Sequence, residues 1–456
     1  MRIRLPEMAI SEEDPFAGDC LERKDFAEAL TSLVQAVDGG GVLTIEGEWG
    51  SGKTTFLRMW RETLIKEGFR TIYFSAWETD HSDAPLVSLL GEFESQIMPE
   101  GEGSGWKTRL YSAGEQLLKR GLPLAARAAA GGIISIDTAA EKALSESTES
   151  LTQKCVNQYS QEKTAIVSFR EALESLSNQS DKPIVVLVDE LDRCRPTYAV
   201  EMLERIKHLF GVNGVVFLLA IDREQLGHSI RSIYGSGMNP DGYLRRFIDL
   251  PCKLPDPDVK AFTKNIIVRF DLHSEIRLKS DYEFRSGHAG ETESVLNIYF
   301  CAYKPALRIM EQIVGELAVI FATTKVNQGI VPIATSTLLF LRYLDRSLYH
   351  RFLSRKITAG TLISELRRDD TFAGILDGRH GQLIEIWLRA ITYTGDSTSY
   401  DDLEEILKGD PDNERAKQMV GRLKDITFHL DYDTLEYLRK KLSFSEALIV
   451  RDDEEK

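Results

Sequence analysis

The chain has 456 residues, which is too long for one average domain and predicts two or three. Its hydrophobic content of 43% and charged content of 28% are those of a globular protein and exclude a disordered or collagen-like chain. The formal charge of −15 excludes a whole-surface electrostatic footprint for nucleic acid, which normally needs a basic domain.

Cysteine usage and the start of the chain bear on location. The five cysteines are odd in number and fit no metal-ligand spacing, which indicates reduced thiols. They are Cys20, Cys155, Cys194, Cys252 and Cys301. The first seven residues lack the long apolar core of a signal peptide. We therefore expect a cytoplasmic protein.

In chain order, the first predicted elements are a helix over residues 25–37 and, after three glycines, a β-type run over 42–45. An eight-residue GxxxxGK[ST] pattern follows and opens an amphipathic helix. Glycines let backbone N–H groups surround a phosphate, and the helix N-terminus favours the same anion. The alternative is a glycine-rich turn that merely reverses the chain.

We therefore predict a site for a nucleoside triphosphate in this loop. Lys53 is expected to reach the β- and γ-phosphates, and the Thr54 hydroxyl to bind Mg²⁺. The predicted nucleotide-binding residues are Gly47, Glu48, Trp49, Gly50, Ser51, Gly52, Lys53, Thr54 and Thr55.

The next predicted strand covers residues 71–74, and a helix over 85–97 follows. Between them lies Trp77, which fits a core aromatic as well as a support for the nucleotide loop. An insertion runs from about residue 100 to 161. Its most apolar stretch contains Arg127 and is shorter than the roughly 20 residues that cross a bilayer. We expect a packing helix or a surface hairpin there, with a membrane-surface segment as the alternative.

A pair of acids ends the buried-strand run over 183–188. An acid at the carboxyl end of such a strand can hold the Mg²⁺ shell, and a following glutamate can orient and deprotonate water. We predict Asp189 as the metal-side residue and Glu190 as the base. The alternative is that the two acids merely open the next helix, whose dipole favours them.

Strands and helices continue to alternate up to residue 255. Helices are predicted over 167–176 and 198–210, and strands over 215–220 and 247–250. This alternation predicts an α/β fold, a parallel sheet covered by helices on both faces, with nucleotide at the carboxyl edge of the strands. Asp222 follows the strand over 215–220, where it can cap the next helix.

After Pro255 the β-type runs stop. Apolar residues recur three or four apart over 262–270, 307–320, 338–353 and 403–407, which predicts helices. The expected domains are a nucleotide-binding core over 14–255, a helical lid over 256–330 and a C-terminal helical region over 331–456.

Basic residues gather between positions 342 and 368. They fit a solvated helix face, with a local nucleic-acid patch as the alternative. These residues are Arg342, Arg346, Arg351, Arg355, Lys356, Arg367 and Arg368.

Five motifs, in this order, resemble a known family. They are Gly47–Leu57, Phe74–Trp77, Val188–Pro196, Ala220–Arg223 and Tyr243–Phe247. Together they look like the KAP P-loop NTPases, over about residues 14–316. The resemblance implies an additional-strand P-loop ATPase related to the AAA+ and STAND groups, with another strand between the two that carry the nucleotide motifs.

The same resemblance bears on membranes. Many KAP relatives carry transmembrane helices inside the P-loop domain, and bacterial ones are associated with phage exclusion or membrane-linked complexes. The insertion at 100–161 occupies the corresponding place but is too polar to span a bilayer. We therefore expect no membrane-spanning segment.

Further site residues follow from the resemblance. Asp222 occupies the place where related ATPases carry a polar sensor of the γ-phosphate, with capping of the next helix as the alternative. Asp192 and Arg193 are expected to order the acid pair through a local ion pair, or else to cap a helix. Arg245 and Arg246 stand where related ring-forming ATPases carry an arginine finger that reaches a neighbour's nucleotide. Arg308 stands where a lid helix can deliver a sensor arginine. Ion pairing with surface acids is the alternative for these three arginines.

The expected function is Mg²⁺-dependent ATP binding and hydrolysis, used as a conformational switch or to drive assembly. An unidentified protein partner, self-assembly and a role in anti-phage defence are compatible with it. A STAND-like signalling scaffold with little turnover is the alternative. A small-molecule kinase is a third hypothesis, weakened because no Arg-rich lid over an acceptor is evident.

Overall fold

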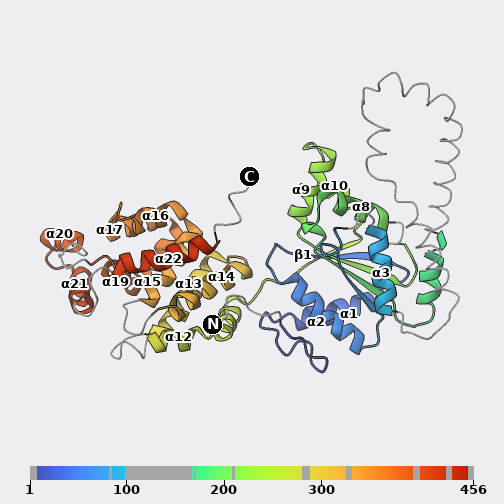
Figure 1. Cartoon of the computed structure of the whole chain (residues 1–456), viewed down its shortest axis with the longest axis horizontal. Helices are drawn as coiled ribbons and strands as arrows, with labels where there is room; N and C mark the ends of the chain where they lie inside the picture. The colour runs from blue at the N-terminus through green and yellow to red at the C-terminus, as the bar shows by residue number, and fades with distance from the viewer. Residues whose placement is uncertain are drawn as a thin grey trace, which may run out of the picture. The chain divides into compact units, whose positions relative to one another are not determined.

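The computed structural model describes residues 8–81, 85–97, 167–168, 170–207, 211–279, 288–324, 331–393, 401–427 and 434–449. The chain divides into two compact units, one over Met8–Asp256 and the other containing Pro257–Lys456. Figure 1 shows that the first unit holds the sheet and the second is helical. The predicted insertion at 100–161 and Cys155 lie outside the described residues.

The first unit alternates strands and helices. Its elements are α1 (Lys24–Ala36), β1 (Gly41–Glu46), α2 (Lys53–Lys66), β2 (Thr71–Ser75), α3 (Pro85–Ile97), a helical segment at 170–177, β3 (Ile184–Asp189), the 3₁₀ turn η1 (Leu191–Arg193), α8 (Pro196–Ile206), β4 (Val215–Ile221), α9 (Arg223–Tyr234), α10 (Pro240–Leu244) and β5 (Leu250–Lys253).

In the described residues, five strands form one sheet in the order β2-β3-β4-β1-β5, and all neighbouring strands in it are parallel. This confirms the predicted α/β fold. Strand β4 lies between β1, which leads into the glycine-rich loop, and β3, which leads into the acid pair. The strand that the family resemblance implied between the two motifs is therefore present.

Helices cover both faces of the sheet. On one face Val42 and Phe217 pack with α3, α8 and α9. On the other, Leu43 and Leu218 pack with α1 and α2, which lie side by side in Figure 1. The Trp60 indole N–H donates to the Thr31 hydroxyl (2.9 Å) and so joins these two helices. Because both faces are buried, β1, β3 and β4 are almost wholly apolar.

The last strand differs from the prediction. The sequence placed it at 247–250, whereas β5 begins at Leu250 and ends at Lys253. Phe247 is instead a buried residue after α10, and the Asp249 carboxylate accepts the Val42 N–H (2.8 Å). Strand β5 lies at the sheet edge and is largely exposed, so it tolerates Pro251 and lacks a buried-strand pattern.

The second unit is built from helices. They are α11 (Val259–Arg269), α12 (Leu272–Lys279), α13 (His288–Tyr303), α14 (Leu307–Ala322), α15 (Pro332–Leu344), α16 (Arg346–Leu353), α17 (Ala359–Leu366), α18 (Asp370–Asp377), α19 (Gly381–Ala390), α20 (Asp401–Gly409), α21 (Glu414–Thr427) and α22 (Thr434–Ile449). The predicted division of this unit at residue 330 stays a prediction.

Two helix predictions need correction. The helix expected over 338–353 is broken at Asp345, whose extended backbone (φ −145°, ψ 94°) ends α15 and whose side chain caps α16. The helix expected over 198–210 begins two residues earlier, because Pro196 suits a first helical position, and α8 ends at Ile206.

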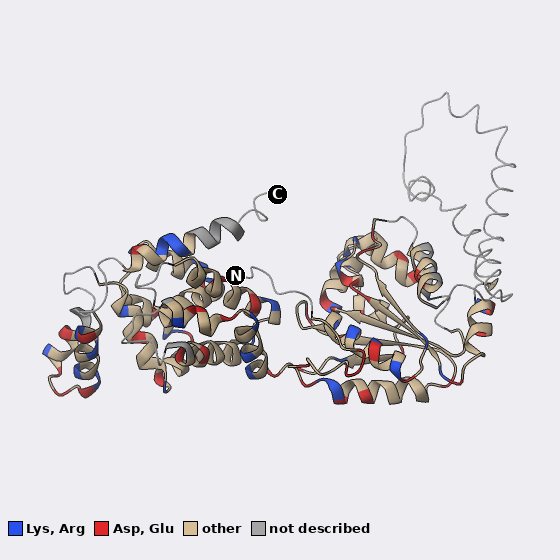
Figure 2. Cartoon of the chain, turned by 60° about the horizontal axis from the view of Figure 1, so that its bottom comes forward, with Lys and Arg blue, Asp and Glu red and all other residues tan. Residues whose placement is uncertain are grey.

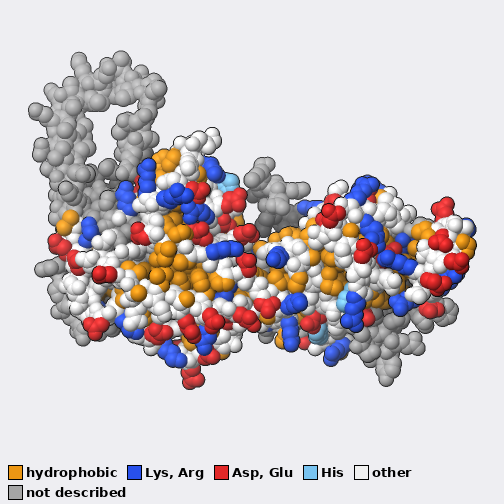
Figure 3. Space-filling view, turned by 180° about the vertical axis from the view of Figure 1, so that it is seen from behind, with side chains coloured by type: hydrophobic (Ala, Val, Ile, Leu, Met, Phe, Trp, Pro, Cys, Tyr) orange, Lys and Arg blue, Asp and Glu red, His pale blue; other side chains and the backbone are white. Residues whose placement is uncertain are grey.

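In the described residues, no helix is both long and apolar enough to cross a bilayer. Figure 3 shows apolar side chains reaching the visible face of each unit. In the helical unit, Val268 of α11 and Leu278 of α12 are the most exposed of the large apolar residues, at 66% and 62%.

Candidate nucleotide site

The glycine-rich loop lies between β1 and α2. The Gly47 N–H donates to the Ile221 carbonyl at the end of β4 (3.2 Å), which ties the start of the loop to the sheet. Gly50 and Gly52 have φ angles of 79° and 87°, a region that favours glycine. A Cβ on Gly47 would stand 2.8 Å from the Ser51 hydroxyl oxygen. These glycines therefore set a tight loop whose end is the N-terminus of α2.

Lys53 is the first residue of α2 and is only 8% exposed. Its ammonium donates to the carbonyls of Gly47 (2.6 Å) and Glu48 (3.2 Å) and lies 3.9 Å from Asp192 Oδ2. Burial lowers the pKa of Lys53, and the nearby carboxylates of Asp192, Asp222 and Asp189 oppose that shift. The side chain is thus a cation held inside the loop by carbonyl oxygens.

Asp189 ends β3 and is 1% exposed. It accepts hydrogen bonds from the Tyr73 hydroxyl (2.8 Å) and the Glu190 N–H (2.8 Å). Burial raises the pKa of Asp189, whereas the Tyr73 and Thr54 donors lower it. The fold therefore brings the predicted metal-side acid against the hydroxyl that was predicted to bind the same ion.

Glu190 stands in the left-handed region with φ 60°, an uncommon conformation for a side chain of this size. Both of its carboxylate oxygens have donors. Ser75 donates to Oε2 (3.1 Å) and Arg193 to Oε1 (2.6 Å). The expected ion pair of Arg193 therefore forms with Glu190, and the Asp192 carboxylate faces Lys53 instead.

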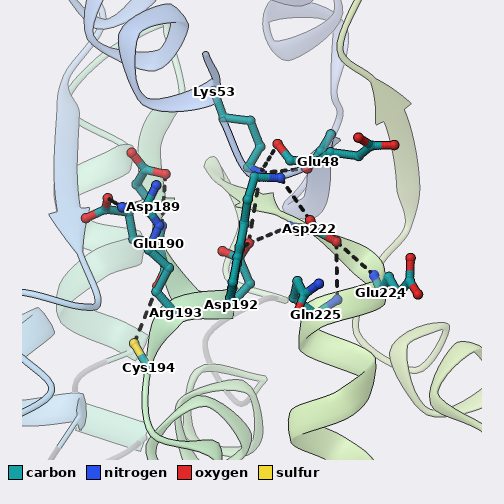
Figure 4. A network of polar contacts seen from close by, with 12 residues as sticks. Glu48, Lys53, Asp189, Glu190, Asp192, Arg193, Cys194, Asp222, Glu224 and Gln225 are labelled. Carbon is teal, nitrogen blue, oxygen red and sulfur yellow. Dashed lines mark hydrogen bonds and ion pairs between the residues drawn. The ribbon is translucent and has the colours of Figure 1, made fainter. Parts of the chain in front are cut away.

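A second group of acids lies beside the loop, as Figure 4 shows. Asp222 caps α9, its Oδ1 accepting the N–H groups of Glu224 (3.1 Å) and Gln225 (3.2 Å). Asp222 Oδ2 accepts the Trp49 N–H (3.0 Å). Asp192 Oδ2 accepts the Trp49 indole N–H (2.6 Å) and the Asp222 N–H (2.9 Å). The cap was foreseen for Asp222, but its contact with the loop was not.

Three residues of the site were not predicted from the sequence. Tyr73 and Ser75 lie at the end of β2, where Ser75 pairs in register with Asp189. Their place at the carboxyl end of a predicted strand was a partial signal, because such ends meet at one edge of a parallel sheet, but it does not say which strands are neighbours. Arg23 is 1% exposed and donates to the carbonyls of Ser51 (2.9 Å) and Pro255 (2.9 Å). Nothing in the local sequence distinguishes it from a surface arginine.

Trp77 and the three predicted finger or sensor arginines are exposed. The Trp77 side chain is 54% exposed, so it is not a core aromatic, and the Arg193 guanidinium stands 6.0 Å from its ring centre. Arg245 and Arg246 are exposed just after α10, and Arg308 is exposed in the first turn of α14 in the other unit. Their predicted roles stay predictions.

Most of the basic cluster at 342–368 is charge-paired. Arg342 pairs with Glu316, Arg351 (3.9 Å) and Arg368 (3.2 Å) both pair with Glu365, and Arg367 pairs with Asp377 (2.8 Å). Figure 2 shows acidic and basic residues interspersed over these helices. The contacts favour a solvated helix surface over a nucleic-acid patch.

The sequence matches the KAP family P-loop domain over residues 23–348. With the sheet order and the loop geometry, this match defines a P-loop NTPase domain. The chain belongs to the KAP family, as its motifs had indicated.

Among known proteins, the chain is similar to the phage T7 exclusion protein of Escherichia coli (strain K12), with 26% identity over 269 residues. The match covers 55% of this chain and 33% of that protein. The chain therefore corresponds to about a third of that relative's length.

Three solved structures were also compared. AMPPCP-bound DnaA from Aquifex aeolicus is 12% identical with a TM-score of 0.30, covering 93% of this chain and 96% of that one. Drosophila ORC bound to GC-rich DNA and Cdc6 is 10% identical with a TM-score of 0.34, covering 94% and 70%. A DNA replication initiation factor is 13% identical with a TM-score of 0.29, covering 93% and 97%. We draw no conclusion from TM-scores this low.

Proposed function

We propose that this protein binds Mg-ATP at the loop Gly47–Thr54 and hydrolyses it, with water as the phosphoryl acceptor. The observation that carries the proposal is the meeting of two distant segments at one sheet edge. Lys53 and Thr54 begin α2, and the Thr54 hydroxyl lies close enough to Asp189, at the end of β3, to lower the pKa of that carboxyl. A phosphate-binding cation, a hydroxyl and a carboxylate are together what a Mg-nucleotide site needs.

The donor set suits Mg²⁺. Asp189 and Thr54 offer a carboxylate and a hydroxyl oxygen in contact, and oxygen is the ligand that Mg²⁺ prefers. In the described part of the chain no group of three or more His, Cys, Asp or Glu side chains is placed to hold a metal by itself. Mg²⁺ bound through one or two protein oxygens together with substrate phosphates does not need such a group. When bound, the ion neutralises charge that develops on the phosphates.

The chain's own residues have distinct tasks in this proposal. Lys53 presents its charge to the β- and γ-phosphates, and the loop N–H groups donate to the same oxygens. Glu190 accepts a proton from the attacking water. Each of its oxygens already accepts one hydrogen bond, from Ser75 or Arg193, and each has a second lone pair that can accept from the water.

Two substitutions separate binding from chemistry. Lys53→Ala should lose Mg-ATP affinity in calorimetry, whereas Lys66→Ala, the same change at the other end of α2, should bind as the wild type does. Glu190→Gln should bind ATP but release phosphate about 10²–10⁴-fold more slowly. Unchanged ATP affinity in Lys53→Ala would refute the phosphate-loop assignment. Wild-type turnover in Glu190→Gln would move the base elsewhere, with Asp192 the next candidate.

A STAND-like scaffold with tight nucleotide binding and little turnover is the second candidate. The observation that favours it is the ion pair and hydrogen bond of Glu190 with Arg193 and Ser75, since donors to the charged carboxylate make it a weaker base. Phosphate release under multiple-turnover conditions, with and without lysate from the native cell, distinguishes the two. Nucleotide that co-purifies and stays uncleaved in both conditions would favour the scaffold.

The relative that excludes phage T7 suggests a role in anti-phage defence, carried out in the cytoplasm with an unidentified protein partner. We propose that nucleotide turnover drives a conformational change or an assembly step in that defence. Plating efficiency of phages on cells that express the wild type or Glu190→Gln tests this. Equal protection by the two would separate defence from hydrolysis.

A further inference from the structure

Trp49 lies in the middle of the phosphate loop and donates two hydrogen bonds to two different acids. Its backbone N–H donates to Asp222 Oδ2 (3.0 Å), and its indole N–H donates to Asp192 Oδ2 (2.6 Å). Both acceptors are buried, at 7% and 5% exposure, whereas Trp49 is 45% exposed. The loop is thus fastened to the segments that follow β4 and β3.

The two acids are also joined to each other and to other parts of the site. Asp192 Oδ2 accepts the Asp222 N–H (2.9 Å) and lies 3.9 Å from the Lys53 ammonium. Asp222 uses its other oxygen to cap α9. Figure 4 shows Lys53, Asp192 and Asp222 converging on the loop. One carboxylate oxygen of each acid is therefore directed at a loop donor.

These contacts use groups that a phosphate would also use. A backbone N–H has one proton, so the Trp49 N–H cannot donate fully to Asp222 and to a phosphate oxygen at once. The Lys53 ammonium faces a similar choice between its present partners and a phosphate. Two carboxylates beside the loop also repel a polyphosphate.

We propose that Asp222 and Asp192 compete with the nucleotide phosphates for the donors of the loop, and that Trp49 is the positioning residue through which this competition acts. The inference rests on the proposed nucleotide site and adds its regulation. Nucleotide binding becomes an exchange, in which phosphate takes the Trp49 N–H from Asp222. The cap of α9 stays in place, because it uses the other carboxylate oxygen.

Asp222→Asn tests the competition. Asparagine is also a good helix N-cap, so Oδ1 can still cap α9, while the amide nitrogen that replaces Oδ2 cannot accept the Trp49 N–H. Hydrogen bonds to charged groups and the energy scale of affinity predict a gain of about tenfold or more in ADP affinity. The gain should appear as a lower Kd in calorimetry.

Asp258→Asn is the matched control. Asp258 caps α11 through the same pair of bonds, to the N–H groups of Lys260 (2.9 Å) and Ala261 (3.1 Å), and the change in net charge is identical. It should leave the ADP affinity unchanged. Asp222→Ser, which keeps a capping oxygen but cannot reach the Trp49 N–H, should gain affinity as Asp222→Asn does.

The fluorescence emission of Trp49 is a second measurement. It would not respond to ADP if Trp49 only stabilised the fold. ADP should change the tryptophan emission of the wild type more than that of Trp49→Phe. The reason is that the phosphates bind beside the Trp49 indole, which donates to the Asp192 carboxylate when no nucleotide is bound. The other tryptophans, Trp60, Trp77, Trp106 and Trp387, are common to both proteins.

The two proposals fail in different ways. If Lys53→Ala abolishes ADP binding while Asp222→Asn and Asp222→Ser, folded by circular dichroism, bind as the wild type does or more weakly, the nucleotide site stands and the competition is wrong. An ADP-saturated wild type with unchanged Trp49 emission would also overturn it. Tighter binding in both Asp222 variants, with Asp258→Asn unchanged, supports it.

Discussion

Asp189 illustrates how a single residue acquires its properties from its neighbours. Burial alone would favour the neutral carboxylic acid, and it raises the pKa of this group. The Tyr73 hydroxyl counters that effect as a donor, and its own pKa is raised by burial first and by Asp189 second, so it keeps its proton. The hydrogen bond therefore fixes the orientation of the Asp189 side chain at the end of β3.

The first prediction removes that donor. Tyr73→Phe should weaken Mg-ATP binding about tenfold, because a hydrogen bond to a charged group contributes about 1.5–3 kcal/mol. Binding of ADP without Mg²⁺ should change much less, since Asp189 is assigned to the metal. Calorimetry with and without Mg²⁺ measures both.

Tyr198→Phe is the control for that change. Tyr198 is buried, whereas Tyr73 is half-buried, and the Tyr198 hydroxyl bonds Thr79 (2.9 Å) rather than Asp189. It should leave Mg-ATP affinity as in the wild type. Equal losses in the two variants would mean that Tyr73 acts only through packing.

At the scale of elements, the parts that could be predicted are those with a strong local pattern. Strands β1, β3 and β4 are buried on both faces and apolar along their length, and the chain shows them as continuous runs. Strand β5 lies at the edge and lacks that signal, so its position was wrong by three residues. The helical spacing of apolar residues likewise continues past Asp345, so the sequence did not reveal the break between α15 and α16.

The site divides in the same way. Lys53, Thr54 and Asp189 stand in short motifs next to a strand, so their meeting could be predicted from the sequence. The partners of Tyr73 and Ser75 are at least 115 residues away in the sequence, in the acid pair after β3. Arg23 contacts Ser51 in the phosphate loop. Such contacts depend on the sheet order and on burial, which no local pattern encodes.

The second prediction concerns the cap of α16. The Asp345 carboxylate accepts the Leu348 N–H (2.8 Å), so Asp345→Ala should destabilise the helical unit by about 1 kcal/mol. Asp345→Asn should stay close to the wild type, because asparagine caps helices as well as aspartate does. Urea denaturation followed by circular dichroism measures the difference. Equal stability of Asp345→Ala and the wild type would show that packing alone fixes this break.

At the scale of the molecule, the end of the α/β unit is tied to its phosphate loop. The buried Arg23 guanidinium donates to the carbonyls of Ser51 in the loop and of Pro255, two residues before the helical unit begins. Burial lowers the pKa of Arg23 to about 10, so the group keeps its charge at neutral pH. A change of the loop at Ser51 therefore acts on a residue that also holds the exit of the chain.

The last prediction asks whether the site is completed by a second copy of the chain. Phosphoryl transfer gains most from a cation placed at the charge developing on the γ-phosphate, and an arginine supplied in this way raises kcat about 10³–10⁵-fold. Arg246 is exposed after α10, and in the described part of the chain no hydrogen bond or ion pair holds its side chain. We therefore choose Arg246 to test a role in a neighbouring subunit's site.

Arg246→Ala should bind ATP normally and hydrolyse it about 10³-fold more slowly. Mixed with Lys53→Ala, it should recover activity, because each variant supplies what the other lacks. Arg231→Ala, an exposed arginine on α9, should hydrolyse ATP as the wild type does, and a variant that carries both Lys53→Ala and Arg246→Ala should not rescue either parent. Arg308→Ala should lose activity without rescue, since its proposed role lies in its own subunit. No recovery at any mixing ratio, together with a monomer in ATP by light scattering, would leave a switch that works within one chain.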